Sequence, residues 1–167
     1  FVSARGLFRG IGDNKFDPSG AMTRAMFATV LAKLDNADLD SYTKSEFMDV
    51  DIDKWYGKVI AWAADKGIVS GYGNGQFGPD DVITREQMAV MLNNYIKYKG
   101  ISLKKAENST FFEDSNSISS WARSAVEVMR SYGLISGVGG NKFNPQGYAD
   151  RASVATIFMN FIKAYLR

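Results

Sequence analysis

The stretch "GIVSGYGNGQFGPDDVITREQM", Gly67 to Met88, has two counterparts in the chain that align with it without a gap. They are "GLFRGIGDNKFDPSGAMTRAMF", residues 6–27, and "GLISGVGGNKFNPQGYADRASV", residues 133–154. Glycines, a phenylalanine, a proline and an arginine recur at the same positions. All three prolines of the chain fall at this one repeat position. The recurrence indicates a repeat protein, in which one supersecondary unit is used three times.

Each copy predicts a helix, a glycine-rich loop and a second helix. Apolar residues recur at helical spacing, and Gly67 and Gly133 close the first helix in the left-handed conformation. Thr23, Thr84 and Asp150 are natural N-caps of the second helix. The first-helix stripes are Trp55, Val59, Trp62 and Ala63, and Trp121, Ala125, Val128, Met129 and Tyr132. The second-helix stripes are Phe27, Val30, Leu31 and Leu34; Met88, Met91, Leu92 and Tyr95; and Val154, Ile157, Phe158, Phe161 and Ile162.

These stripes predict an all-α fold of three helix-loop-helix repeats that share one core. A single unit of about 50 to 60 residues is too small to enclose its apolar face, whereas three units can do so together. We place the repeats at residues 1–36, 47–98 and 112–167, with linkers at 37–46 and 99–111, in one compact domain. The first repeat has no counterpart of Trp55, so we expect the chain to begin inside its leading helix.

Composition excludes several classes of function. The chain has 167 residues, no cysteine and no histidine, which removes disulfides, thiolate and imidazole metal sites and the usual general base at neutral pH. A net charge of +2 is too small for a dedicated nucleic-acid binder. No apolar run has the length of a membrane span. We therefore expect no enzyme activity, catalytic residue, metal, cofactor, nucleic-acid partner or membrane insertion.

An arginine at the start of each second helix is the unusual feature. Arg24, Arg85 and Arg151 each follow the N-cap, where a cation costs roughly 0.3 to 1 kcal/mol against the helix dipole. A bound anion would offset that cost, because backbone N–H groups and a guanidinium fork both suit a carboxylate. A structural ion pair between repeats is the main rival, although the threefold recurrence favours a bound anion. Both interpretations remain open on the sequence alone.

The complete pattern resembles the S-layer homology domain. It runs from Phe-x-Asp and a tryptophan, through a Gly-rich loop with Phe-x-Pro, to Thr-Arg at the start of the second helix. The resemblance implies an all-α, pseudo-threefold arrangement around a central helical bundle, with ligand grooves between repeats. It also implies that the chain anchors a bacterial surface protein or exported enzyme non-covalently to an acidic, pyruvylated secondary cell-wall polysaccharide. The expected location is extracellular, in the cell wall or surface layer, and the expected state is monomeric.

Two departures from the family pattern concern the arginines. The family motif is Thr-Arg-Ala-Glu or close to it, whereas none of the three copies keeps the carboxylate at the fourth position. The third copy also has Asp150 in place of threonine. That carboxylate could pair with Arg151 and compete with an anionic ligand, so we rank Arg85 first among the three sites, Arg24 second and Arg151 last. An assembly module with inter-repeat ion pairs is the alternative function.

The residues expected to bind ligand come from the helix starts and from the loops after the first helices. For the glycines, a close approach by a sugar and tight-turn geometry are equally good explanations. The two tryptophans could stack on sugar faces, although their place on the apolar stripe favours a position in the core. The expected ligand-binding residues are Arg24, Arg85, Arg151, Gly10, Gly71, Gly137, Ser70, Ser136, Leu7, Ile68, Leu134, Trp55 and Trp121.

Overall fold

The computed structural model describes residues 17–107 and 110–166, and every structural statement below concerns these residues. They form five α-helices and one short 3-10 helix, with isolated β-bridges and no strand, which confirms the all-α class. None of these helices has the length and apolar character needed to cross a bilayer. Leu7, Gly10 and the front of the first repeat lie outside the described residues. The elements are α1 (Arg24–Asp35), α2 (Gly57–Asp65), α3 (Arg85–Tyr98), η1 (Ser115–Ser117), α4 (Arg123–Ser131) and α5 (Arg151–Tyr165).

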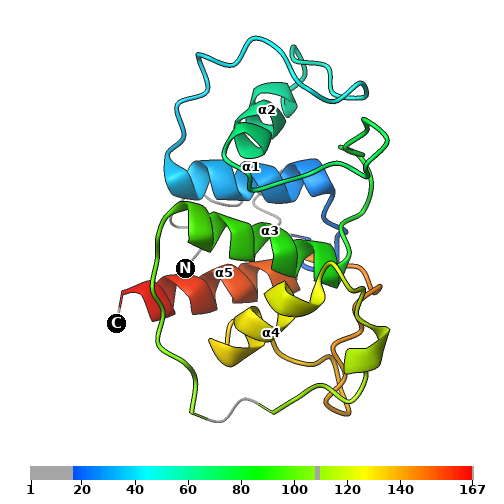
Figure 1. The fold of residues 1–167 in the computed structure, drawn as a ribbon, viewed down its shortest axis with the longest axis vertical. Helices are drawn as coiled ribbons and strands as arrows, with labels where there is room; N and C mark the ends of the chain where they lie inside the picture. The colour runs from blue at the N-terminus through cyan, green and yellow to red at the C-terminus, as the bar shows by residue number, and fades with distance from the viewer. Residues whose placement is uncertain (1–16, 108–109, 167) are drawn as a thin grey trace.

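The second helices of the three repeats, α1, α3 and α5, lie side by side and form the centre of the molecule (Figure 1). Phe27 of α1 meets Phe158 of α5 with ring centroids 5.5 Å apart. Tyr95 of α3 meets Phe161 of α5 edge to face at 6.3 Å. These contacts use the apolar stripes predicted from the sequence, and nearly all of the stripe residues are buried. Helical periodicity therefore identified the core face of each second helix correctly.

The leading helices cover this centre in a way that interlocks the repeats. Helix α2 of the second repeat packs against α1 of the first, and α4 of the third repeat packs against α3 of the second. Both leading helices end where the sequence predicted. Gly67 and Gly133 follow them with φ of 64° and 66°, a conformation that glycine adopts without strain. Each leading helix therefore finds its main partner in the preceding repeat.

Hydrogen bonds at the starts of the three central helices close the repeats into a ring. The first two backbone N–H groups of α1 donate to Asp81 and Pro79 in the loop of the second repeat, at 2.9 and 3.1 Å. The same pair of bonds recurs at α3 and α5. The acceptors there are Gly147 and Pro145 of the third repeat for α3, and Gly20 and Pro18 of the first repeat for α5.

Three isolated β-bridges follow the same cyclic order. They join Thr23 to Val82, Thr84 to Tyr148, and Ala21 to Asp150, which are matching positions in the three copies. Every repeat thus contacts both others through the segment that precedes its second helix. These contacts support the pseudo-threefold arrangement, which remains a prediction for the molecule as a whole.

Two aspartates fix the glycine-rich loops against the segments that precede the leading helices. Asp49 accepts hydrogen bonds from the backbone N–H groups of Phe77 and Gly78, at 2.8 and 2.7 Å. Asp114 accepts the equivalent bonds from Phe143 and Asn144, both at 2.7 Å. Burial raises the pKa of each carboxyl, but the backbone hydrogen bonds outweigh it, so both pKa values lie below the ordinary value.

We expect Asp114→Asn to destabilise the fold by about 1–3 kcal/mol at pH 7, because an amide has one acceptor oxygen where two N–H groups need acceptors. A carboxyl with a lowered folded-state pKa contributes stability above its unfolded-state pKa, near 3.9, and loses it as the pH falls further. The difference between variant and wild type should therefore shrink below about pH 4. Urea unfolding at several pH values measures this. The exposed Asp80→Asn serves as the control, and a wild-type stability of Asp114→Asn at pH 7 would contradict the assignment.

Candidate binding site between the repeats

Arg24 reaches from the start of α1 into the glycine-rich loop of the second repeat. Its Nε donates to the carbonyl oxygen of Phe77 at 2.8 Å, and its Nη2 donates to that of Ser70 at 3.2 Å. The guanidinium carbon lies 4.5 Å from the centroid of the Phe77 ring and 4.6 Å from that of Tyr72. Only 5% of the residue is exposed. Arg24 thus holds both ends of a loop that belongs to another repeat.

Arg85 makes the corresponding contacts one repeat further along. Its Nε donates to the carbonyl oxygen of Phe143 at 2.7 Å, and its Nη2 donates to that of Ser136 at 2.8 Å. The guanidinium carbon lies 5.1 Å from the Phe143 ring centroid. Arg85 is also 5% exposed. The two arginines are therefore equivalent in burial and in the way they join neighbouring repeats.

These contacts explain why an arginine stands at a helix start. Two carbonyl dipoles and an aromatic face stabilise the cation and offset its unfavourable position in the helix dipole. Burial lowers the pKa of both guanidinium groups, while Tyr72, Asp81 and Asp49 oppose the shift at Arg24. Among the described residues no carboxylate forms an ion pair with Arg24 or Arg85, and carbonyl oxygens of the neighbouring repeat meet both cations instead. In the described residues the ion pairs join Lys66 to Asp65, Lys99 to Asp35 and Arg130 to Glu127.

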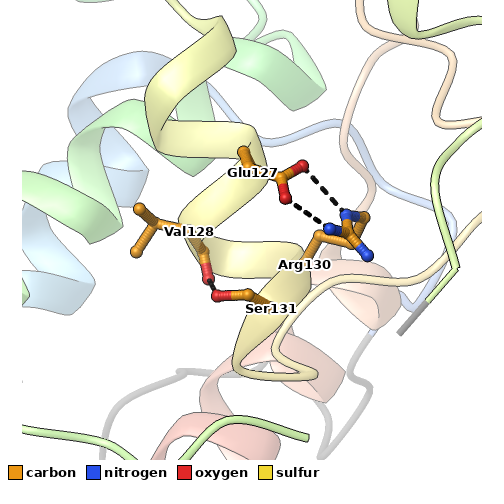
Figure 2. Close-up of polar contacts among 4 residues, drawn as sticks. All are labelled: Glu127, Val128, Arg130 and Ser131. Carbon is orange, nitrogen blue, oxygen red and sulfur yellow. Dashed lines mark hydrogen bonds and ion pairs between the residues drawn. The ribbon is translucent and has the colours of Figure 1, made fainter. Parts of the chain in front are cut away.

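Arg130 is a third buried arginine, and unlike Arg24 and Arg85 it forms an ion pair with a carboxylate, that of Glu127. Figure 2 shows its guanidinium turned toward Glu127 on the same helix, α4. Nε donates to one carboxylate oxygen at 3.0 Å, and Nη2 donates to the other. The guanidinium carbon also lies 4.3 Å from the centroid of the Phe111 ring. The charge of Arg130 is therefore neutralised within its own helix, in contrast to Arg24 and Arg85.

The expectation that helix N–H groups would help to bind an anion is wrong. The first two N–H groups of α1 donate to loop carbonyls, and the third, of Met26, donates to the Thr23 hydroxyl at 3.2 Å. At α3 the third N–H donates to Thr84, and at α5 it donates to Asp150 at 2.7 Å. Asp150 thus caps its helix. Because these groups are already paired, any anion at the site would have to be recognised by side chains.

A pocket of about 410 Å³ lies beside Arg24, and residues of all three repeats line it. Arg24 comes from α1 of the first repeat. Gln87, Val90 and Met91 come from α3 of the second repeat, and Trp121 comes from the third. The loop segment Ile68, Val69, Ser70, Gly71, Tyr72 and Gly73 completes the lining. One cation, one amide and a largely apolar wall therefore meet in one place.

The pocket brings together five of the residues predicted from the sequence: Arg24, Ile68, Ser70, Gly71 and Trp121. The other predicted residues lie elsewhere or outside the described residues. Arg85 and Ser136 meet at the next inter-repeat contact, with Gly137 and the buried Leu134 in the same loop. Arg151 begins α5, and its backbone N–H donates to Gly20 at 3.0 Å.

The prediction that Trp55 and Trp121 lie on buried helical stripes is wrong. Both precede their helices by two residues, and they are 58% and 57% exposed. The helices begin at Gly57 and Arg123, so helical periodicity does not apply to the tryptophans. Both rings lie largely at the surface instead: Trp55 meets the Tyr56 ring edge to face at 5.3 Å, and Trp121 lines the pocket.

Gly71 is needed for packing of the loop. A Cβ atom there would lie 2.3 Å from the carbonyl oxygen of Gln76 and 2.8 Å from the Phe47 ring. The Tyr72 N–H also donates to Gln76 at 2.8 Å, which closes the loop tightly. At Gly137 the nearest atom, the Lys142 carbonyl oxygen, would lie at 3.0 Å. Of the two interpretations for these glycines, loop geometry has direct support.

Sequence reasoning missed several residues of the pocket. Tyr72 stacks on Arg24, and its hydroxyl donates to Asp81 at 2.7 Å. Gln87 completes the capping box of α3, with its side-chain oxygen 3.1 Å from the Thr84 N–H, and also lines the pocket. A comparison of the copies could have found both, since Ile11 and Val138 match Tyr72, and Met26 and Ser153 match Gln87. The middle repeat is the most polar of the three at these positions.

Comparison with known proteins agrees with the repeat pattern. The family model described as the S-layer homology domain matches residues 1–28, 46–89 and 111–155. The chain is 35% identical over 164 residues to an exoglucanase, XynX, of Acetivibrio thermocellus, covering 97% of this chain and 15% of that protein. It is 30% identical over 155 residues to a cellulosome-anchoring protein of the same species, covering 90% of this chain and 34% of the relative.

A third relative is an S-layer protein of Bacillus thuringiensis subsp. finitimus, 28% identical over 155 residues, with coverage of 93% of this chain and 18% of the relative. The chain thus corresponds to about a third or less of the length of each of these proteins. The three matched segments coincide with the three copies whose loops and helix starts interlock in the structure. The chain belongs to the S-layer homology domain family.

Proposed function

We propose that this chain is a non-catalytic module that anchors a larger protein to the bacterial cell wall by binding an acidic polysaccharide in the pocket beside Arg24. The membership of the family and the surface-layer relatives indicate an extracellular location at the cell surface. One relative is named a cellulosome-anchoring protein, and two others are named an exoglucanase and an amylopullulanase, of which the matched part is a small fraction. A shared anchoring module accounts for its presence in both kinds of protein.

The pocket itself carries the proposal. A guanidinium has five N–H donors, and Arg24 uses two of them for the carbonyls of Phe77 and Ser70. The other three are the donors that a bound carboxylate would use. Because the cation is buried and has no carboxylate partner among the described residues, its attraction for an anion is screened less than at the open surface.

The neighbouring groups suit a sugar that bears a small, partly apolar acid. Ile68, Val90 and Met91 form an apolar wall, and Trp121 presents an exposed aromatic ring. A pyruvate ketal combines a carboxylate with a methyl group on a sugar ring, so it would place a charge near Arg24 and a methyl group near the wall. We therefore propose a pyruvylated secondary cell-wall polysaccharide as the ligand. Arg85, which makes the same carbonyl bonds, serves to join the second and third repeats.

Arg24→Lys and Arg85→Lys form a matched pair that separates joining from binding. A lysine ammonium lacks the planar fork that reaches two carbonyls, so each variant should lose about 1–3 kcal/mol of stability. Urea unfolding measures this loss. Sedimentation with purified cell-wall polymer should show about tenfold weaker binding for Arg24→Lys and near wild-type binding for Arg85→Lys. Equal binding by the two variants would refute the assignment of the ligand to the Arg24 pocket.

Calorimetric titration tests the identity of the acid. We expect a synthetic pyruvylated sugar to bind at least about tenfold more tightly than the same sugar without the ketal, because a charge-assisted hydrogen bond to the guanidinium is lost. Raising the salt concentration should reduce the difference, since it originates from charge. Equal affinities for the two sugars would contradict the carboxylate proposal and leave only neutral contacts.

A further inference from the structure

Glu86 is a buried carboxylate for which the proposed function has so far given no role. It is 1% exposed and lies in the first turn of α3, beside Arg85. The matching residues in the other two repeats are Ala25 and Ala152, so helix formation does not require a carboxylate there. A carboxylate in this environment is costly unless its oxygens are fully hydrogen-bonded.

All of the side-chain hydrogen bonds of Glu86 in the described residues go to the third repeat. Its Oε2 accepts from the backbone N–H of Ser119 at 3.0 Å, and its Oε1 accepts from the Ser119 hydroxyl at 2.8 Å. Oε1 also accepts from Nε2 of Gln146 at 2.5 Å. The carboxylate thus holds Ser119 at two points through neutral donors. The favourable field at a helix N-terminus adds to its stabilisation.

Ser119 begins the turn that carries Trp121. Its carbonyl accepts from the backbone N–H groups of Ala122 and Arg123, at 2.9 and 3.2 Å, and this closes the turn around the tryptophan. Trp121 is 57% exposed, so packing against the core contributes little to the position of its ring. Ile118 and Ala122 anchor the ends of this stretch in the core, and the two bonds between Ser119 and Glu86 fix the start of the turn, residues 119–122, against α3.

We infer that Glu86 is a positioning residue for the pocket, which holds Trp121 at the pocket that Arg24 also lines by fixing the turn at residues 119–122. This inference rests on the proposed function of the pocket. The helix α3 that carries Glu86 also supplies Gln87, Val90 and Met91 to the pocket wall. Glu86 thus ties the tryptophan of the third repeat to the wall formed by the second. The alanines at the matching positions leave the other two interfaces without such a tie.

The contrast with the preceding interface supports this assignment. Asp53 matches Ser119, and Ala25 matches Glu86, so no carboxylate from α1 can hold the turn before Trp55. The Asp53 backbone N–H donates instead to the side chain of Asp51 at 3.0 Å, within its own repeat. The two exposed tryptophans therefore differ in how they are held, although they occupy the same repeat position. Only the turn of Trp121 is fixed from another repeat in this way among the described residues.

Four single variants of the full chain test the inference: Glu86→Ala, Ser119→Ala, Trp121→Ala and, as the matched control, Gln146→Ala. Gln146 donates to Glu86 and, at 3.4 Å, to the Ser119 hydroxyl, but its removal leaves both bonds between Ser119 and Glu86 in place. The first readout is the heteronuclear NOE of the Trp121 indole N–H, which requires no ligand. We expect it to fall in Glu86→Ala and in Ser119→Ala and to stay at the wild-type value in Gln146→Ala. A wild-type value in both of the first two variants overturns the inference.

The second readout is binding to purified cell-wall polymer. Glu86→Ala and Ser119→Ala should each bind about tenfold more weakly, Gln146→Ala should stay within about twofold of wild type, and Glu86→Ala should add nothing to Trp121→Ala. Unchanged binding in Glu86→Ala with weakened binding in Trp121→Ala overturns the inference and keeps the proposed function. Unchanged binding in Trp121→Ala, with a lowered NOE in Glu86→Ala, refutes the proposed pocket and keeps the positioning of the turn. If Glu86→Ala fails to fold, the NOE and the binding measurement are both made on Ser119→Ala, with the same expected and contradicting results.

Discussion

The structure depends on a guanidinium that crosses from one repeat to the loop of the next. Arg24 and Arg85 each donate to two carbonyl oxygens whose residues lie seven positions apart in the receiving loop. A repeat of this size cannot bury its own apolar stripes, so the repeats must be held in register with one another. The arginines do so together with the N–H groups at the helix starts, which bond the proline loops. The bonds that join two neighbouring repeats are therefore the same bonds that hold the receiving loop closed.

The same interaction creates the place where a ligand could bind. By holding the loop that contains Ser70 and Phe77, Arg24 brings its own charge to the edge of a pocket whose walls come from the other repeats. The helix N–H groups are already bonded, so the helix dipole is not free to hold an anion there. Recognition then falls to the side chains. Small differences between the copies, such as Tyr72, Gln87 and Glu86 in the middle repeat, can make one interface differ in function from another.

Much of the fold could be predicted from the sequence, because the buried face of a helix appears in the sequence as apolar residues repeated every three to four positions. The stripes of α1, α3 and α5, the glycines after α2 and α4, and the all-α class all follow from that rule. The position of the tryptophans could not be predicted in the same way. Trp55 and Trp121 fit the helical period by spacing, yet they lie in the turns before their helices. A stripe shows which residues would share a face if the helix extended to them, but it does not show where the helix begins.

For a related reason, the sequence showed that the arginines have a common role but did not show which groups they contact. Their recurrence showed that something offsets the cost of a cation at a helix start, but carbonyl oxygens have no sequence signature. Every residue has one, and the acceptors, Ser70, Phe77, Ser136 and Phe143, are brought near only by the tertiary fold. Glu86 was hidden likewise, because its partner Ser119 lies 33 residues away in another repeat.

The most direct measurement follows individual side-chain N–H signals by NMR while an acidic, pyruvylated saccharide is added. The account predicts that the Nε–H signal of Arg24 and the indole N–H signal of Trp121 shift together and saturate at the same ligand concentration. The buried Trp62 indole and the Arg85 Nε–H should stay in place. Saturable shifts at Arg85 or elsewhere, with Arg24 and Trp121 unchanged, would contradict the central claim that the contact joining the first two repeats also forms the binding site.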